Sequence, residues 1–317
     1  MLLNFLAIVF FSLLLIKATD VLVIHLKSLS RKIAVGGFAL AAFLVGFSTS
    51  LPELFVGLTS AFEGIPTLSL GNLIGANISN LSLVVGLAAF LGGGVKIRNG
   101  AERRDLFYAF LAGAIPLIFL FDKELGRIEG IVLIIIYLSY NYFLLRKRDQ
   151  TLEENGGFWR GFLRRFQHKE TKKELEIIFL SLVLIIISAD IKVRLAKTIA
   201  VSINFPPFLI GLFLLAIGTS LPELVFGFEA VRKKEGEMLM GNLIGSLVIN
   251  STLIVGLVAL ISPIKIKTFS DYTLASVVFV TLFLLVYVFT KTKNRLEKWE
   301  GLALVAVYII FFILELM

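Results

Sequence analysis

Long apolar runs follow one another along the chain, separated by short polar connections that are often basic. The runs are continuous rather than alternating, and roughly 17–25 apolar residues are enough for a helix to cross a bilayer. A backbone in lipid must satisfy its own hydrogen bonds, so continuous runs predict helices and not barrel strands. We expect an all-α polytopic membrane protein with ten spans, at roughly 2–26, 34–62, 66–93, 105–121, 127–145, 175–200, 207–231, 237–262, 271–290 and 299–316.

The composition agrees with this class. Of the 317 residues 57% are hydrophobic, and the mean hydropathy is +0.91, well above the ordinary globular range. The chain has no cysteine, which excludes disulfides and thiol chemistry. The first run has no basic segment before it and no small-residue cleavage site, so it is interpreted as a retained span and not as a signal peptide.

The basic residues are distributed unevenly between the connections. Of the 31 Lys and Arg residues, 23 fall in the odd-numbered connections and seven on the opposite side, with Lys17 inside the first span. The positive-inside rule then predicts cytoplasmic odd connections and extracellular termini. The net charge of +8 thus reflects membrane orientation, and no nucleic-acid partner is expected.

Two motifs occur twice at a constant separation of 170 residues. Residues 49–54 read T-S-L-P-E-L and recur at 219–224, and residues 71–75 read G-N-L-I-G and recur at 241–245. Asn80 and Gly86 match Asn250 and Gly256 in the same register. Asp20 and Lys27 extend the register back to Asp190 and Lys197. The chain is therefore predicted to be an internal duplication.

Each copy contains five spans, an odd number, so the second copy enters the membrane from the opposite side. Inverted repeats of this kind are typical of secondary transporters that alternate access to one central site. The predicted organisation is a first five-helix repeat at 1–145, a cytoplasmic linker at 146–174 and an inverted second repeat at 175–317.

The repeated T-S-L-P-E motif places a carboxylate in the middle of a span. Pro52 and Pro222 remove a backbone donor, so each should kink its helix and free a carbonyl of the preceding turn, at Ser48 and Gly218. Glu53 and Glu223 follow directly, and an ionised carboxylate at that depth is costly unless it is paired or ligated. Neither has a basic residue nearby in its own span, which argues against a structural ion pair.

These positions share an all-oxygen chemistry. The hydroxyls of Thr49, Ser50, Thr219 and Ser220 and the amides of Asn80 and Asn250 join the two carboxylates, and calcium prefers six to eight flexible oxygen ligands. A site for a soft metal is not expected, because the chain has no cysteine and its only histidines, His25 and His168, are expected at the surface.

Two further features are weaker signals. The G-x-x-x-G spacing of Gly71 and Gly75, and of Gly241 and Gly245, favours close helix packing that brings the helix of each asparagine, Asn80 or Asn250, against a glutamate helix. Asp20 and Asp190, with Lys17 and Lys192 nearby, predict local ion pairs or snorkelling side chains in the first span of each half.

At these motifs the chain resembles the calcium/cation antiporter superfamily, and most closely its prokaryotic sodium/calcium exchangers. The resemblance covers nearly the whole chain in span count and repeat layout. It is carried by T-S-x-P-E, which occurs twice, and by G-N-x-I-G-S-x-x-x-N, which is complete in the second copy and has Ala76 in place of the serine in the first. It implies a core of the second, third, seventh and eighth spans, with the first and sixth spans as long slanted helices that slide across that core.

The resemblance also implies roles for individual residues. Glu53 and Glu223, with the carbonyls of Thr49 and Thr219, would form a calcium site. Sodium sites would lie to either side of it, and Asn80 and Asn250 would be central. The resemblance assigns to the sodium sites Ser50, Ser220, Ser246, and the backbone at Gly46 and Ala216.

Two positions depart from the pattern of the superfamily. Ala76 stands where the first repeat usually has a serine, although its mate Ser246 is present, so one sodium site and the stoichiometry are in doubt. Asn250 stands where close prokaryotic relatives and potassium-dependent exchangers have an aspartate, which argues against potassium co-transport.

The resulting hypothesis is a secondary antiporter of a prokaryotic plasma membrane that exchanges Ca²⁺ for Na⁺, with no cofactor and no evident protein partner. Proton/calcium exchange is the alternative, because a desolvated glutamate can carry a proton. The hydroxyl-rich flanks favour sodium. A membrane-embedded enzyme would need a nucleophile–base pair or a metal cluster in the loops, and a channel fits paired buried carboxylates less well.

The charge asymmetry predicts a cytoplasmic linker around Gly156 and Gly157. Protease added outside intact cells should therefore leave this linker uncut, whereas protease added to inside-out vesicles should cleave it. Cleavage in intact cells would contradict the predicted orientation.

Overall fold

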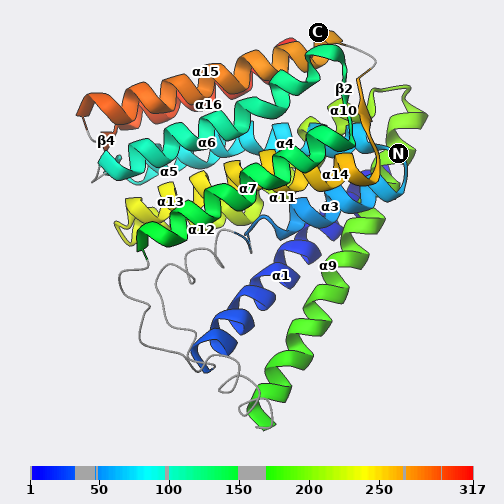
Figure 1. The fold of residues 1–317 in the computed structure, drawn as a ribbon, viewed down its shortest axis with the longest axis horizontal. Coiled ribbons are helices and arrows are strands. Elements are labelled where there is room, and N and C mark those ends of the chain that lie inside the picture. Colours follow the sequence, from blue (N-terminus) through cyan, green and yellow to red (C-terminus); the bar gives the residue numbers. More distant parts are fainter. Residues whose placement is uncertain are drawn as a thin grey trace.

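The computed structural model of the protein describes residues 2–32, 47, 49–96, 100–148, 169–266, 269–293 and 295–316. Its long elements are helices, most of which lie side by side in a bundle (Figure 1). The elements up to residue 148 are α1 (Leu2–Lys32), α3 (Leu51–Phe62), α4 (Pro66–Ser79), η1 (Asn80–Val84), α5 (Val85–Leu91), β1 (Val95–Lys96), α6 (Gly100–Phe119), η2 (Leu120–Asp122), β2 (Glu124–Leu125) and α7 (Arg127–Arg148).

The elements from residue 169 onward follow a similar order. They are α9 (Lys169–Ser202), α10 (Pro207–Leu209), η4 (Ile210–Leu215), α11 (Ala216–Thr219), α12 (Leu221–Arg232), α13 (Gly236–Val248), η5 (Ile249–Ile254), α14 (Val255–Ile261), β3 (Ile264–Lys265), α15 (Phe269–Lys293), β4 (Arg295–Leu296) and α16 (Lys298–Leu316). The predicted linker 146–174, with Gly156, Gly157 and His168, lies mostly outside the described residues.

Several helices are long and apolar enough to cross a membrane, which confirms the predicted class. Among the described residues five meet this condition, and a sixth does so if the bent pair Pro207–Thr219 and Leu221–Arg232 is one span. The five are Leu3–Leu22, Pro66–Leu91, Asp105–Asp122, Gly236–Ile261 and Tyr272–Lys291. The remaining predicted spans include 34–62, which lies partly outside the described residues, so the count of ten stays a prediction.

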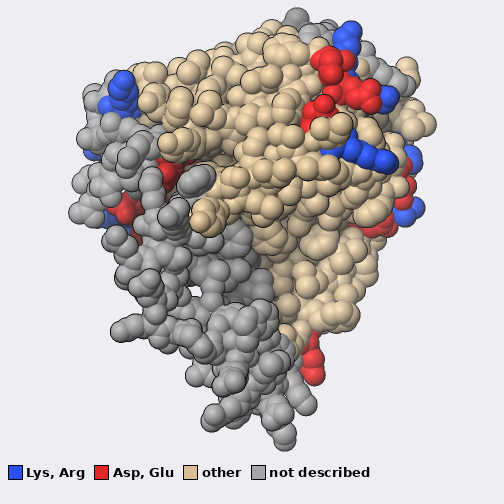
Figure 2. Space-filling view, in the orientation of Figure 1, with Lys and Arg blue, Asp and Glu red and all other residues tan. Residues whose placement is uncertain are grey.

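The surface supports the same class. Figure 2 shows a broad uncharged face on the bundle, with the charged side chains of the described residues gathered toward its edges. Many large apolar side chains are exposed on the helices, including Phe107 on α6, Ile135 on α7 and Ile309 on α16. A water-exposed domain rarely shows so continuous an apolar surface, whereas lipid accepts it.

The proline of each repeated motif follows a break in its helix. Ser50 and Ser220 precede Pro52 and Pro222 by two residues and have nearly the same backbone, with φ −88° and ψ 4° at Ser50 and φ −82° and ψ 0° at Ser220. The second break bends the helix by 41°. The predicted kink at Pro222 is therefore confirmed, because proline cannot donate the hydrogen bond that would continue the helix.

Helices α1 and α9 form an antiparallel pair that projects to one side of the other helices (Figure 1). His25 and Ser28, late in α1, both bond to Glu174, early in α9, and the Ser28 bond is 2.7 Å long. Ile8 and Leu15 share an apolar cluster with Val193 near the opposite ends of the two helices. His25, predicted to be a surface histidine, therefore has a specific acidic partner on the neighbouring helix.

Two short strand pairs connect segments that are far apart in the sequence. Strand β1 pairs antiparallel with β4, and β2 pairs antiparallel with β3. The labels of β4 and β2 lie at opposite ends of the bundle in Figure 1. Each pair joins a strand from before residue 148 to one from after residue 169, so the two parts of the chain are linked at both ends.

Glycines allow two helices to touch backbone to backbone. A Cβ on Gly71 would overlap the carbonyl oxygen of Phe208, and one on Gly75 would overlap that of Leu212. The contact is mutual, since a Cβ on Gly211 would overlap the carbonyl oxygen of Leu68. The predicted close packing is confirmed for Gly71 and Gly75, and its partner is the segment that leads into Glu223, in the other half of the chain. At Gly241 the prediction is wrong, because a Cβ there would meet nothing within 4 Å among the described residues.

Gly71→Ala should therefore destabilise the protein by about 1–3 kcal/mol, because the new methyl group forces backbone apart. The repeat supplies a matched control at Gly241, where a Cβ would meet nothing within 4 Å among the described residues. Gly241→Ala should change stability by no more than about 1 kcal/mol, and in the favourable direction. Thermal unfolding in detergent measures both, and equal melting temperatures for the two variants would contradict the packing described.

Candidate functional site

Glu53 and Glu223 lie completely inside the protein. Each is the third residue of a helix that starts after the break, Glu53 in α3 and Glu223 in α12, with exposures of 0% and 1%. None of their four carboxylate oxygens receives a hydrogen bond within the described part of the chain. A buried, ionised carboxylate whose oxygens receive no hydrogen bond is strongly unfavourable, so this arrangement favours a cation beside it.

The two motifs meet at these carboxylates. Thr219 lies beside the carboxylate of Glu53, and Thr49 lies beside that of Glu223. The two carboxylates are close enough for electrostatic repulsion between them. Four residues predicted to share one calcium site, two from each half of the chain, are thus neighbours in space.

Crossed hydrogen bonds hold the two threonines. The Thr49 hydroxyl donates to Oδ1 of Asn242 over 3.0 Å. The Thr219 hydroxyl is shared between Oδ1 of Asn72 and the carbonyl oxygen of Ala216, each at 3.2 Å. Each threonine–asparagine bond therefore joins a motif in one half of the chain to the asparagine of the other half. Sequence reasoning did not assign Asn72 and Asn242 to the site, although their presence in the repeated G-N-L-I-G motif was a signal for it.

Asn80 and Asn250 stand in wide helical turns. Asn80 begins the π-helical turn η1, and Asn250 is the second residue of the π-helical turn η5. Helix α3, with Glu53, packs against η5, and helix α12, with Glu223, packs against η1. Turns of this type often occur at functional sites, because they leave backbone groups of the helix unpaired.

The predicted ligands include many buried oxygens that receive no hydrogen bond from the described residues. Ser50, Ser220 and Ser246 are 1%, 3% and 0% exposed, and their hydroxyls have no partner among those residues. The same holds for the amide oxygens of Asn80 and Asn250. Ala216 is buried at the start of α11, and Gly46 lies outside the described residues.

A second polar chain extends from Asn250. Its amide donates to Oδ1 of Asn77 over 3.1 Å, and Asn77 donates in turn to the Ser251 hydroxyl over 2.8 Å. The repeat mate of Asn77 is Leu247, so the repeat contained no signal for this contact. These bonds orient the Asn250 side chain so that its amide oxygen is left for another partner.

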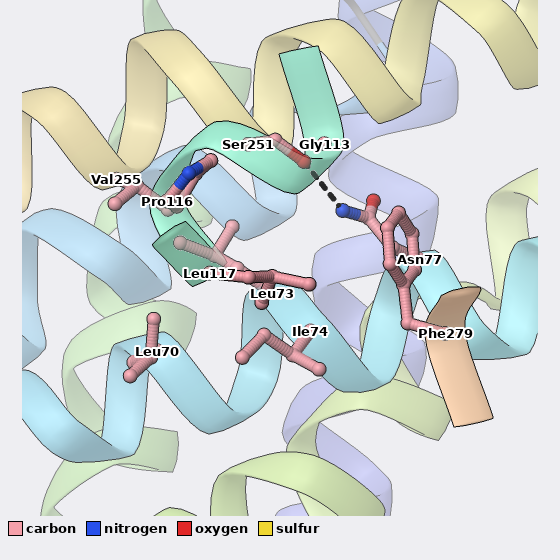
Figure 3. Close-up of a pocket in the computed structure, with 10 residues that line it drawn as sticks. All are labelled: Leu70, Leu73, Ile74, Asn77, Gly113, Pro116, Leu117, Ser251, Val255 and Phe279. Carbon is pink, nitrogen blue, oxygen red and sulfur yellow. Dashed lines mark hydrogen bonds between the residues drawn. The ribbon is translucent and has the colours of Figure 1, made fainter. Parts of the chain in front are cut away.

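Figure 3 shows Asn77 and Ser251 at one side of a narrow pocket between α4, η5, α6 and α15. The other lining residues are large apolar residues, one glycine and one proline, and no acidic or basic side chain is among them. They are Leu70, Leu73, Ile74, Gly113, Pro116, Leu117, Val255 and Phe279. An apolar pocket without a charge suits a gap in helix packing better than an ion site.

The predicted local ion pair in the first span of the second half is present at Asp190, but the prediction is wrong for Lys192, which is not the partner. Asp190 pairs instead with Arg194, at 2.9 Å, on the exposed side of α9. Lys192 points the other way and is 0% exposed, which also excludes snorkelling. Its charge acts on Glu53, so a cation from another span does approach that carboxylate.

Taken together, the site offers two carboxylates and a set of neutral oxygens. The described residues contain no group of three or more His, Cys, Asp or Glu that could hold a metal ion. A cation here would therefore depend on hydroxyl, amide and carbonyl oxygens beside Glu53 and Glu223. Hard cations such as calcium and sodium accept this ligand type.

Comparison with known proteins identifies similar chains. Residues 3–146 and 174–317 match the family described as sodium/calcium exchanger protein. The sodium/calcium exchanger MaX1 of Methanosarcina acetivorans is 27% identical, over 98% of this chain and 97% of its own. The inner membrane protein YrbG of Escherichia coli is 30% identical, over 85% of each chain. The solved structure of the sodium-calcium exchanger NCX_Mj, soaked with Na⁺ and Sr²⁺, aligns with a TM-score of 0.66 and 26% identity over 98% of both chains.

The crossed bonds predict measurable coupling between the halves of the chain. Thr219→Val and Asn72→Leu should show a coupling energy of about 0.5–1.5 kcal/mol in a double-mutant cycle, because each removes the same hydrogen bond. A cycle between Thr219→Val and Ser60→Ala serves as the control, since Ser60 bonds to Val56 instead. Unfolding in detergent is the measurement, and additive effects in the first cycle would contradict a functional Thr219–Asn72 bond.

Proposed function

The chain belongs to the sodium/calcium exchanger protein family, and from this premise we propose that it exchanges Ca²⁺ for Na⁺ at a site in the middle of the membrane, built on Glu53 and Glu223. The burial of both carboxylates without a hydrogen-bond donor among the described residues carries the proposal. A divalent ion between them lies against both carboxylate charges, and sodium ions beside them compensate one carboxylate charge each. Competition for the same carboxylates makes the transport an exchange.

The remaining ligands divide between the two ions. Backbone oxygens at Thr49 and Thr219 complete calcium coordination, since calcium requires six to eight oxygens. Sodium binds on either side of that position, near the second residue of each T-S-L-P-E motif, and Asn80 and Asn250 lie between. The buried oxygens without partners support the assignment of Ser50, Ser220, Ser246, Asn80 and Asn250.

Alternating access follows from two inverted repeats of five spans. Contacts between the connections support this arrangement. Under the ten-span prediction β1 and β4 both fall in odd connections, and β2 and β3 both fall in even ones. The pair His25–Glu174 joins the end of the first predicted span to the fifth connection, and the 2.7 Å pair Arg194–Glu63 joins the last turns of the sixth predicted span to the second connection. Each contact therefore joins segments assigned to the same side of the membrane.

Helices α1 and α9 are the moving element in this proposal. They pack on each other along much of their length and lie to one side of the other helices (Figure 1). Sliding of this pair across the core would open the site first to one side of the membrane and then to the other. The excess of basic residues in the odd connections supports a cytoplasmic linker and external termini, in a prokaryotic plasma membrane.

Proton/calcium exchange is the second candidate, since the same buried glutamates could exchange calcium for protons. Reconstitution in liposomes separates the two. Uptake of calcium-45 is measured with a sodium gradient or a proton gradient, each with and without clamped voltage. Uptake that requires the sodium gradient supports the proposal, whereas uptake driven by the proton gradient alone supports the second candidate.

We predict that Glu53→Gln and Glu223→Gln each nearly abolish calcium uptake in a folded protein, because each removes half of the negative charge at the site. Glu229→Gln is the matched control. Glu229 lies on the same helix as Glu223, but its side chain is 62% exposed and pairs with Lys233 at 3.2 Å. It should transport as the unaltered protein does. Normal uptake by either buried variant would exclude a shared site.

A further inference from the structure

Lys192 is a buried cation without a conventional partner. Its neighbours on the inner face of α9 are Ser188, Ala189, Val193 and Ala196, all 0% exposed like Lys192 itself. Its ammonium has no hydrogen-bond acceptor among the described residues. A buried charge in that position is strongly unfavourable unless another charge compensates it, so a structural role alone does not explain this residue.

The end of the Lys192 side chain lies at the second T-S-L-P-E motif. A Cβ built on Gly218 would lie 3.4 Å from the Lys192 ammonium nitrogen and 2.8 Å from the hydroxyl oxygen of Ser12. Gly218 directly precedes Thr219, which lies beside Glu53. The ammonium thus reaches the place where α1, α9 and the helix break of the second motif meet.

The ammonium of Lys192 therefore lies in the neighbourhood of Glu53, where the two opposite charges attract each other. The two side chains form no ion pair within 4 Å in the described structure. Lys192 therefore contributes its charge to the site while both Glu53 oxygens remain available to a ligand.

The repeat shows that this feature belongs to one half of the chain. The mate of Lys192 is Leu22, a buried apolar residue of α1. The mate of Ser246 is Ala76, on α4. Helix α4 packs against α11, and Gly75, the residue before Ala76, lies against Ala216 of α11. Beside the second motif, Ala76 thus has a methyl group where its mate Ser246 has a hydroxyl. Lys192 has an ammonium there, where its mate Leu22 has an apolar side chain.

We propose that the Lys192 ammonium is a built-in monovalent cation of the transport site. Beside Gly218 it supplies the charge that a sodium ion would otherwise bring to the second T-S-L-P-E motif, so that of the two sodium positions only the one near Ser50 takes a free ion. This inference rests on the proposed exchange at Glu53 and Glu223. An ammonium and a sodium ion carry the same charge and attract the same oxygens. The lost hydroxyl at Ala76 is then no defect, because no free ion needs it.

The consequence is a different charge balance during transport. Two ionised glutamates and one ammonium leave a single negative charge at the site. One sodium ion neutralises this charge, whereas one calcium ion leaves a net positive charge. Lys192 therefore weakens calcium binding and reduces the number of sodium ions exchanged for each calcium ion. Removing its charge should reverse both effects.

The test compares Lys192→Met with the unaltered protein in liposomes. We expect the half-saturating calcium concentration to fall by at least about tenfold, because a repulsive charge near the site is lost. The sodium gradient that just balances a calcium gradient at clamped voltage gives the coupling ratio, which should rise by one sodium ion. Lys17→Met is the matched control, since Lys17 is exposed on α1, the helix paired with α9. It should change neither quantity.

An unchanged calcium affinity together with an unchanged coupling ratio in Lys192→Met would overturn the inference. Absence of sodium-driven calcium uptake by the unaltered protein would instead overturn the proposed function, so the two failures are distinguishable.

A stability measurement covers the case in which Lys192→Met transports too poorly to analyse. In ion-free detergent, Glu53→Gln with Lys192→Met should melt higher than Glu53→Gln alone, because the second change removes an unbalanced charge. Strictly additive melting shifts would contradict a functional Glu53–Lys192 interaction.

Discussion

Two carboxylates in a solvent-free core are the constraint on which the rest of this structure depends. Glu53 and Glu223 are nearly inaccessible, and no described donor bonds to their oxygens, so their charges are tolerable only beside a cation. The helix break before each of them brings polar backbone and hydroxyl groups to the same depth. Close glycine contacts and crossed threonine–asparagine bonds then hold the two breaks against each other.

The crossing of contacts between the halves has a mechanical consequence. Thr49 bonds to Asn242, Thr219 bonds to Asn72, and the two strand pairs also join one half of the chain to the other. Neither half can therefore form its part of the site alone. The core is held as a unit, whereas the paired helices α1 and α9 lie to one side of it (Figure 1). This division suits a transporter in which a mobile element moves across a rigid core.

The differences between the halves are as informative as their similarity. Lys192, Asn77 and Ser246 are polar residues whose mates are Leu22, Leu247 and Ala76. All three polar side chains are buried. A buried polar group is costly unless it has a partner, and its presence on only one side makes the two sides chemically unequal. An exchanger that binds ions of different charge can use that inequality to set its coupling ratio.

The amino-acid sequence by itself determined the class of the protein, the duplicated motifs and the helix break at Pro222, because apolar run length and proline chemistry act locally. The repeat also identified both glutamates, since a carboxylate amid apolar residues is conspicuous without any coordinates. Only the tertiary structure decided that Lys192 turns inward while Asp190 pairs with Arg194, and that Asn72 and Asn242 bond across the halves. The direction of a side chain depends on how its helix is rotated against distant neighbours, and sequence spacing does not specify that rotation.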